Sequence, residues 1–235
     1  MKPLGTSSNA SHPSHLLAVM VLKLYGAPHS TATKRAAVVL VEKGVPFEFI
    51  VVDTAKLEQK TPEYKAKHPF GQIPLLDDDG FLLYESRAIG RYIAEKYADQ
   101  GTPLLPPNGD LKKKALFEQA ASNEVANFDF FASQIWREYG PKKRAGLEPD
   151  QEFIAKLNKD LSAKLDAYEV ILSKQKYIAG DELSLIDLFH LPFGANIPTA
   201  GADAIATHPN VSRWFKEISD RPSWQALNDG VKSTV

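Results

Sequence analysis

The feature that most limits the possible folds of this chain is a change of pattern at residues 99–110. Before this stretch, short apolar runs typical of strands alternate with amphipathic helical patterns. The stretch itself, DQGTPLLPPNGD, is rich in proline and glycine and is typical of a linker. After it the strand signals disappear. The sequence therefore predicts an α/β domain over 20–98, a linker over 99–110 and an all-α helix bundle over 111–235.

The first domain has the predicted order β-α-β-α-β-β-α. Strand runs lie at 20–25 and 46–53, a hairpin at 73–85, and helices at 32–43, near PEYKAKH and at 86–98. The first two strands flank a helix, so they should be parallel with a right-handed crossover. The dipeptide Asp79-Gly80 supplies the hairpin turn. A mixed sheet covered by helices in this order is the thioredoxin-like arrangement.

The second domain shows only helical periodicity. Its helices are predicted at about 111–139, 150–175, 184–195 and 208–220, with a short one near 222–229. Ser184 and Asp187 have the spacing of an N-terminal capping pair, which indicates a structural role. The charged stretch PKKRAG, from Pro141 to Gly146, predicts a solvated loop.

Composition excludes several classes of protein. The chain has 235 residues with 28 basic and 29 acidic side chains, so its net charge gives no argument for a nucleic-acid partner. It has no cysteine, which excludes disulfides and protein thiolates, and any thiol must come from a ligand. No apolar run is long enough to span a membrane. Residues 1–19 read as a disordered extension, native or added, and because the pair His12 and His15 lies there, no metal site is predicted.

Hydroxyl side chains stand where the first strand ends and the first helix begins. As a structural residue, Ser30 caps this helix by accepting a hydrogen bond from a first-turn N–H. The same place suits a bound thiolate, because a helix N-terminus carries unpaired N–H groups and partial positive charge. Lowering the pKa of a thiol from about 8.5 by about two units takes about 2.7 kcal/mol, which is on the order of one charge-assisted hydrogen bond plus the helix dipole. From the residues alone, both roles stay open.

Two further stretches are candidates for ligand contacts. In FGQIP, Pro74 cannot donate to a strand ladder, so the step from Ile73 is either tolerated at a sheet edge or is a cis peptide that exposes the backbone of Ile73 to an extended peptide. In YESRAIG, Glu85 and Ser86 begin a helix, either as ordinary cap residues or as a pocket for the carboxylate and ammonium of an amino acid. A thiol, a peptide backbone and an amino-acid end group together fit glutathione.

Five segments in order resemble the cytosolic glutathione transferases, most closely the phi class. They are STATKR, TPEYKAKHPFGQIP, LYESRAI, KYIAGDELSLIDLFHLP and HPNVSRWFKEISDRPSWQAL. The resemblance covers nearly all of the chain from Met20 onward and implies a thioredoxin-like domain followed by a helical one. It implies glutathione as the co-substrate, a homodimer and a cytoplasmic location. Tyr64 is a candidate clasp between the subunits.

The resemblance also assigns site residues. The catalytic serine would be Ser30, and the glutathione contacts would be Gln59, Lys60, Gln72, the backbone of Ile73 before Pro74, Glu85 and Ser86. Two positions depart from the phi pattern: Gln59 stands where histidine is common, and His68 where asparagine or glutamine usually precedes PFGQ. Both departures would weaken the affinity for glutathione without touching the activating serine.

The hydrophobic substrate should bind between the domains. The aromatic stretch NFDFFASQIW offers Phe128 and Phe131 for the wall of that site, with His29 beside the sulfur, although aromatics at this spacing also build bundle cores. The predicted function is transfer of the glutathione thiolate to hydrophobic electrophiles, with reduction of organic hydroperoxides by the same thiolate. The alternatives are a ligandin that carries apolar small molecules, and an interaction module like that of the elongation factor gamma subunit.

Overall fold

A four-stranded mixed sheet forms the base of the first domain in the computed structural model, which describes residues 21–235. The expectations for residues 1–19, including the metal pair, lie outside the described residues. The strands are β1 Leu22–Gly26, β2 Phe47–Val51, β3 Leu75–Asp78 and β4 Phe81–Tyr84. Their order is β2-β1-β3-β4, with β1 parallel to β2 and antiparallel to β3. The predicted thioredoxin-like order is confirmed.

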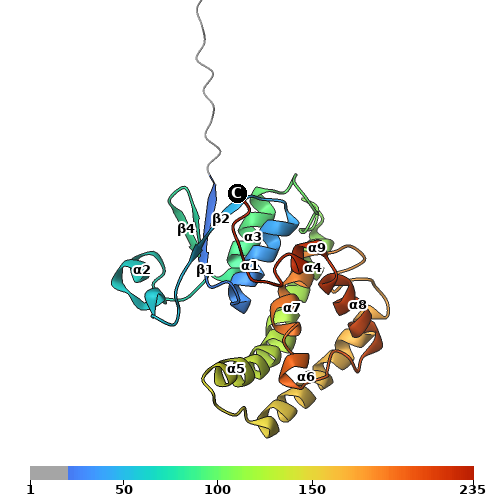
Figure 1. The fold of residues 1–235 in the computed structure, drawn as a ribbon. Helices are drawn as coiled ribbons and strands as arrows, with labels where there is room; N and C mark the ends of the chain where they lie inside the picture. The colour runs from blue at the N-terminus through green and yellow to red at the C-terminus, as the bar shows by residue number, and fades with distance from the viewer. Residues whose placement is uncertain (1–20) are drawn as a thin grey trace, which may run out of the picture.

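Helices cover both faces of this sheet. They are α1 Thr31–Glu42, η1 Glu58–Lys60, α2 Pro62–Lys67 and α3 Ser86–Lys96. Figure 1 shows α1 and α3 together on the face toward the helical domain, and α2 on the other side. Gly90 on α3 allows the second domain to approach closely, because a Cβ there would lie 2.8 Å from the ring of Phe189. One apolar core therefore runs from the sheet through α1 and α3 into the helical domain.

A smaller apolar cluster lies at α2. Val52, Tyr64 and Leu75 form its buried centre. The Tyr64 side chain is 9% exposed and stacks on the ring of His68. The ring therefore stabilises this cluster and is largely covered within its own chain, which lends no support to Tyr64 as a subunit clasp.

The predicted hairpin has the turn that its sequence requires. Asp79 and Gly80 both have positive φ angles, of 52° and 86°, between β3 and β4. This is the backbone that Asp-Gly adopts readily and that matches the twist of a two-residue hairpin. The Asp77 carboxylate also accepts a hydrogen bond from the N–H of Gly80.

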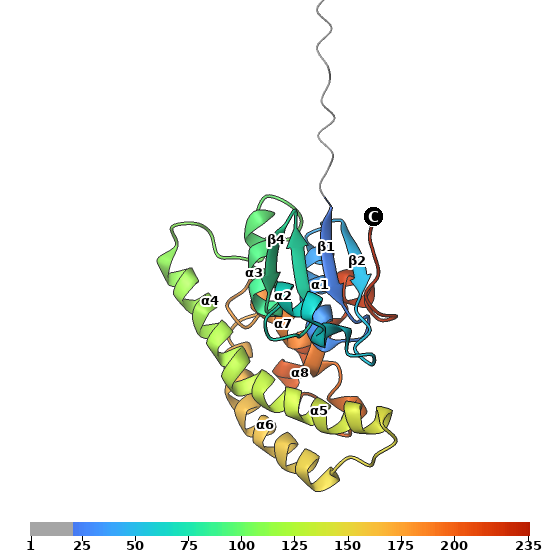
Figure 2. The same cartoon turned by 90° about the vertical axis from the view of Figure 1, so that its left-hand side faces the viewer.

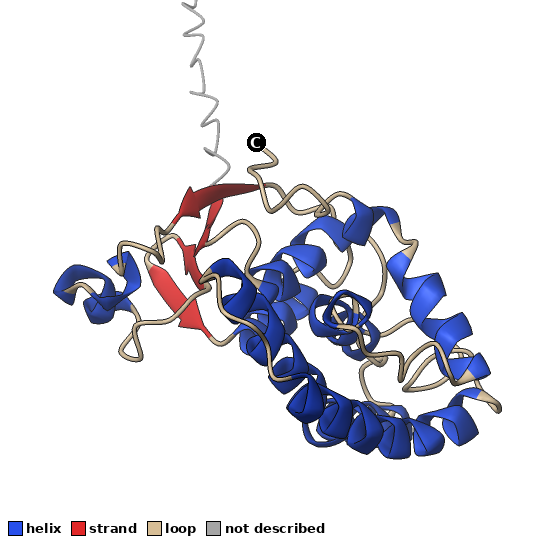
Figure 3. Cartoon of the chain, turned by 60° about the horizontal axis from the view of Figure 1, so that its bottom comes forward, coloured by secondary structure: helices blue, strands red, loops and turns tan. Residues whose placement is uncertain are grey.

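The second domain is entirely helical. Its elements are α4 Leu111–Asn123, η2 Glu124–Asp129, α5 Phe130–Arg144, α6 Gln151–Leu172, α7 Leu185–Gly194, η3 Pro198–Ala200, α8 Pro209–Ser219 and α9 Pro222–Gln225. Figure 2 shows α4 running into α5 as one long bent rod, with α6 returning beside it, and Figure 3 shows the strands gathered at one side of the molecule with helices making up the rest. The bend falls at η2, which is a π-helical stretch.

Two predictions for this domain have definite outcomes. Ser184 and Asp187 form the capping box of α7, and the Asp187 carboxylate also accepts from the N–H of Ile178 and from Trp214 Nε1. Their structural role is confirmed. The loop predicted from Pro141 to Gly146 is wrong up to Arg144, because α5 continues to that residue. Proline lacks only its own N–H donor, and the helix continues past it.

Candidate functional site

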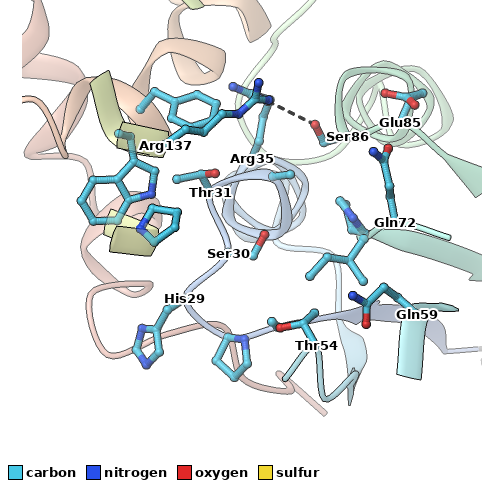
Figure 4. Close-up of a pocket in the computed structure, with 18 of the residues that line it drawn as sticks. His29, Ser30, Thr31, Arg35, Thr54, Gln59, Gln72, Glu85, Ser86 and Arg137 are labelled. Atoms are coloured by element: carbon cyan, nitrogen blue, oxygen red, sulfur yellow. Dashed lines mark hydrogen bonds between the residues drawn. The ribbon is translucent and has the colours of Figure 1, made fainter. Parts of the chain in front are cut away.

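A cavity of about 700 Å³ lies where the first domain meets α5. Each residue predicted to bind glutathione lines it: Gln59, Lys60, Gln72, Ile73, Pro74, Glu85 and Ser86, together with Ser30 and His29. Figure 4 shows Ser30 near the centre, with Gln59, Gln72 and Glu85 on one side and Arg137 on the other. The fold thus brings together four chain segments that lie as much as 57 residues apart in the sequence.

Ser30 is the N-cap of α1 and also faces the cavity. Its Oγ accepts a hydrogen bond from the N–H of Thr33 at 3.3 Å. A serine hydroxyl has one proton and two lone pairs, so this bond leaves the proton available to a group in the cavity. Thr31 and Ala32, in the first helical turn, line the same space. The capping role and the ligand role are therefore compatible in one side chain.

The backbone at the opposite side of the cavity is unusual at two points. The peptide between Ile73 and Pro74 is cis, as one of the two alternatives for FGQIP required. Glu85 has a φ angle of 72°, which is rare for a residue with a side chain. It precedes Ser86, the first residue of α3, so an acidic side chain, a hydroxyl and a helix N-terminus adjoin in one corner. Such a corner suits an amino-acid end group.

A buried arginine connects this corner to the helical domain. Arg35, on α1 and only 3% exposed, donates to Ser86 Oγ at 3.3 Å and to the Asp129 carboxylate at 2.6 Å. Arg87 binds the same carboxylate at 2.8 Å and forms a two-pronged pair with Glu124. Hydrogen bonds and charge from Glu124 and Asp129 raise the pKa of Arg87, although burial opposes them. Arg35, held by the carboxylate that it shares with Arg87, thus positions the hydroxyl of Ser86.

Sequence reasoning missed Arg35 and Asp129, both of which line the cavity. The available signal was a lone arginine before the apolar run AAVVLV, which indicated a charge on a buried helix. Its partner on η2 is 94 residues away in the chain and gave no local signal.

The two departures from the phi pattern lie at the edge of the same cavity. The Gln59 Oε1 atom is buried and has no hydrogen-bond partner among residues 21–235, and the same holds for His68 Nδ1. Burial lowers the pKa of His68, whose ring stacks on Tyr84 with centroids 4.5 Å apart. Lys60 donates from Nζ to the carbonyl of Phe70 at 3.3 Å. Polar groups around this end are therefore available to a ligand.

The wall from the helical domain differs from the one predicted. Besides Asp129, its residues are Trp136, Arg137, Pro141, Arg144 and Phe193. Phe128 is fully buried, with its ring on His190 and Tyr168, so it belongs to the core and not to the cavity. Phe131 is half-buried beside Phe130 and is not among the lining residues either. The π-helical stretch sets which side of α5 faces the cavity, and this phase was not visible in the sequence.

Over residues 21–235, no cluster of three or more histidine, aspartate or glutamate side chains is arranged to hold a metal ion. In the same range, no helix combines the length and the apolar character needed to cross a membrane.

Comparisons with known proteins identify the family. The glutathione S-transferase N-terminal domain model matches residues 20–95, and the C-terminal domain model matches residues 127–222. Glutathione S-transferase hmp2 of Hypomyces subiculosus is 45% identical over 87% of this chain and 96% of its own length. Glutathione S-transferase PM239X14 of Arabidopsis thaliana is 45% identical over 84% and 91%. The crystal structure of glutathione transferase F7 from Populus trichocarpa superposes with a TM-score of 0.84 at 39% identity, covering 89% of this chain and 98% of its own. With both domain models, these relatives and the matching fold, the chain belongs to the glutathione S-transferase family and groups with its phi-class members.

Proposed function

We propose that this protein transfers the glutathione thiolate to organic electrophiles, with Ser30 as the residue that stabilises the thiolate. The observation that carries the proposal is the position of the Ser30 hydroxyl, which faces the cavity at the start of α1 while one of its lone pairs caps the helix. The protein supplies proximity and electrostatic stabilisation and forms no covalent bond with either substrate.

Glutathione would lie along the wall of the first domain. The corner of Glu85 and Ser86 suits its γ-glutamyl end, the backbone of Ile73 suits its cysteinyl amide, and Lys60 suits its glycine carboxylate as a flexible point charge. This extended pose leaves the sulfur at Ser30, between the two walls of the cavity. The conjugation forms a carbon–sulfur bond, expels the leaving group of the electrophile, and releases the thiol proton to solvent.

The experiment is the substitution Ser30→Ala. We expect a higher pKa for the bound thiol, read from thiolate absorbance, and lower turnover of chlorodinitrobenzene at neutral pH. The loss should reach at most about 25-fold, because a pKa raised by about two units, from about 6.5 to about 8.5, lowers the thiolate fraction at pH 7 from about 0.8 to about 0.03. The control is Asp110→Ala, which removes the N-cap of α4, where Asp110 accepts from the N–H of Lys113. Each variant loses about 1 kcal/mol of cap energy, but only Ser30→Ala should lose activity. Equal activity in wild type and Ser30→Ala would refute the assignment.

The same thiolate would also reduce organic hydroperoxides. It attacks the peroxide oxygen and releases an alcohol, and a second glutathione then yields the disulfide and water. A panel of electrophiles and hydroperoxides measures the balance between the two reactions. Tight binding of apolar compounds with no turnover of any of them would instead favour the ligandin.

We also propose that the protein forms a homodimer. Phe70, Phe81 and Phe130 expose 64%, 51% and 57% of their surface, and exposure of this size in three phenylalanines supports contact with a second chain. Sedimentation analysis tests this, and a monomer at micromolar concentration would contradict it.

A further inference from the structure

The last turns of α5 carry four cations that divide into two kinds. Lys142 pairs with Glu138, and Lys143 pairs with Glu148 at 2.8 Å. Arg137 and Arg144, by contrast, make no hydrogen bond or ion pair with any side chain of residues 21–235, and both line the cavity. The two lysines are thus neutralised outside the cavity, whereas the two arginines face it with their charges uncompensated.

These arginines lie on one stripe of the helix. Arg137, Pro141 and Arg144 follow at intervals of four and three residues, which places them one above the other on the same face. The acids of the cavity do not reach across to neutralise them. The Asp129 carboxylate is held by Arg35 and Arg87, and Glu85 lies on the opposite side of Ser30 from Arg137 (Figure 4).

We propose that the electrophile of this enzyme carries an anionic group, a carboxylate or sulfonate, that binds Arg137 and Arg144 while its apolar framework lies against Trp136 and Phe193. This inference rests on the proposed function and names its substrate class. A guanidinium remains charged at any working pH and matches the two oxygens of a carboxylate. Trp136, which precedes Arg137 on α5 and is half-buried, offers flat apolar surface for an aromatic or unsaturated carbon skeleton. Phe193 lines the same cavity but is 7% exposed, with the Arg35 guanidinium over its ring, so its contribution is smaller. This wall therefore recognises an amphipathic anion.

The test compares two substrates that differ by one charge. They are a chlorodinitrobenzoate, with its carboxylate para to chlorine, and the methyl ester of the same acid. Each rate is divided by the uncatalysed rate with glutathione, because the ester is intrinsically more reactive. In both, the thiolate attacks the chlorine-bearing carbon and chloride leaves. We expect the normalised kcat/KM of the wild type to favour the carboxylate, and the preference to shrink with added salt.

The variants are Arg137→Gln, Arg144→Gln and the double variant. Each single change should lower the ratio of carboxylate to ester kcat/KM by about fivefold, the upper range for one exposed charge contact. Lys143→Gln removes the same charge from the same helix at a position outside the cavity, and it should leave the ratio unchanged. An unchanged ratio in the double variant would overturn the inference. A rise in the KM for glutathione with no change in the ratio would also overturn it, since the arginines would then bind the tripeptide.

A binding measurement separates this inference from the proposed function. The glutathione conjugates of the acid and of the ester are titrated against the protein, with quenching of tryptophan fluorescence as the signal. If the wild type turns over the ester but binds both conjugates equally, the charge inference fails and the transferase stands. If it turns over neither substrate yet binds the acid conjugate more tightly in an arginine-dependent way, conjugation fails and the anion site stands.

Discussion

The two walls of the cavity are built in different ways. The wall of the first domain presents short side chains and backbone at the ends of strands and helices, such as Ser30, Ile73 and Ser86, together with longer side chains such as Lys60 and Gln72. Their positions are set by the sheet, by a cap and by the buried Arg35. The wall of the second domain comes mainly from α5, with Phe193 of α7 beside it, and the long side chains of Arg137 and Arg144 on α5 are exposed.

This difference suits a two-substrate enzyme. A wall whose groups are fixed by backbone geometry loses little entropy on binding and can hold one constant ligand in one pose. A wall of exposed side chains can accept different ligands and changes its chemistry by substitution without disturbing the fold. Variants that act on one wall, on both walls, or on the core behind them test this difference.

The largest effect should come from the core behind the second wall. Phe128→Ala removes a fully buried ring and should lower the free energy of unfolding by about 4 kcal/mol. Trp136→Ala removes a ring from the wall itself, which is only half-buried, and should cost less stability but raise the KM for the electrophile. Denaturant titration and kinetics of both variants measure the contrast. If Phe128→Ala raised the KM for the electrophile as much as Trp136→Ala does, Phe128 would belong to the cavity wall and not to the core.

The next largest effect on stability should come from the contacts of Asp129 with Arg35 and Arg87, which join the two walls. Asp129→Ala leaves Arg35 and Arg87 without their shared carboxylate, and unfolding free energy should fall by about 3 kcal/mol because buried charge is uncompensated. Because Arg35 also holds Ser86, the KM for glutathione should rise as well. Stability loss with unchanged glutathione KM would mean that the two walls are independent.

Acid should weaken the second domain through His190. Burial lowers the pKa of His190 to about 4, while the unfolded chain keeps the ordinary value of 6.5. Between these values the unfolded state binds a proton that the folded state does not, so stability falls as pH falls through this window. From about pH 8 to about pH 5 the loss should be about 2 kcal/mol. Denaturant titrations of wild type and His190→Gln give the two slopes, and identical slopes would exclude this histidine as the cause.

The smallest effect should come from the C-terminal segment, which supports the first wall. Figures 1 and 2 show the C-terminus beside β2. There Thr234 donates from its N–H to the carbonyl of Phe47 at 3.0 Å, and Val231 does so to the carbonyl of Pro28, also at 3.0 Å. Ser233→Ala removes only the hydroxyl that accepts from the N–H of Phe49, so it should lower the free energy of unfolding by about 1 kcal/mol and raise the KM for glutathione slightly. Removing residues 231–235, which also takes away the buried Val231, should cost more stability in the same denaturant titration.

The sequence by itself determined the features that depend on neighbouring residues. The turn at Asp79-Gly80, the cap at Ser30 and the capping box at Ser184 all follow from residues within a few positions of one another. Local backbone preferences and first-turn hydrogen bonds act over one turn, so a single sequence displays them. The candidate residues of the first wall come from such short motifs.

Only the tertiary structure decided which residues form the second wall and which ion pair joins that wall to the first. Phe128 and Trp136 are both aromatic residues on one helical stretch, and nothing local tells which is core and which is lining. The π-helical turn at η2 sets that choice by rotating α5. The pairing of Arg35 with Asp129 spans 94 residues. Such choices depend on which apolar faces are buried against each other, and that is settled by packing across the whole molecule.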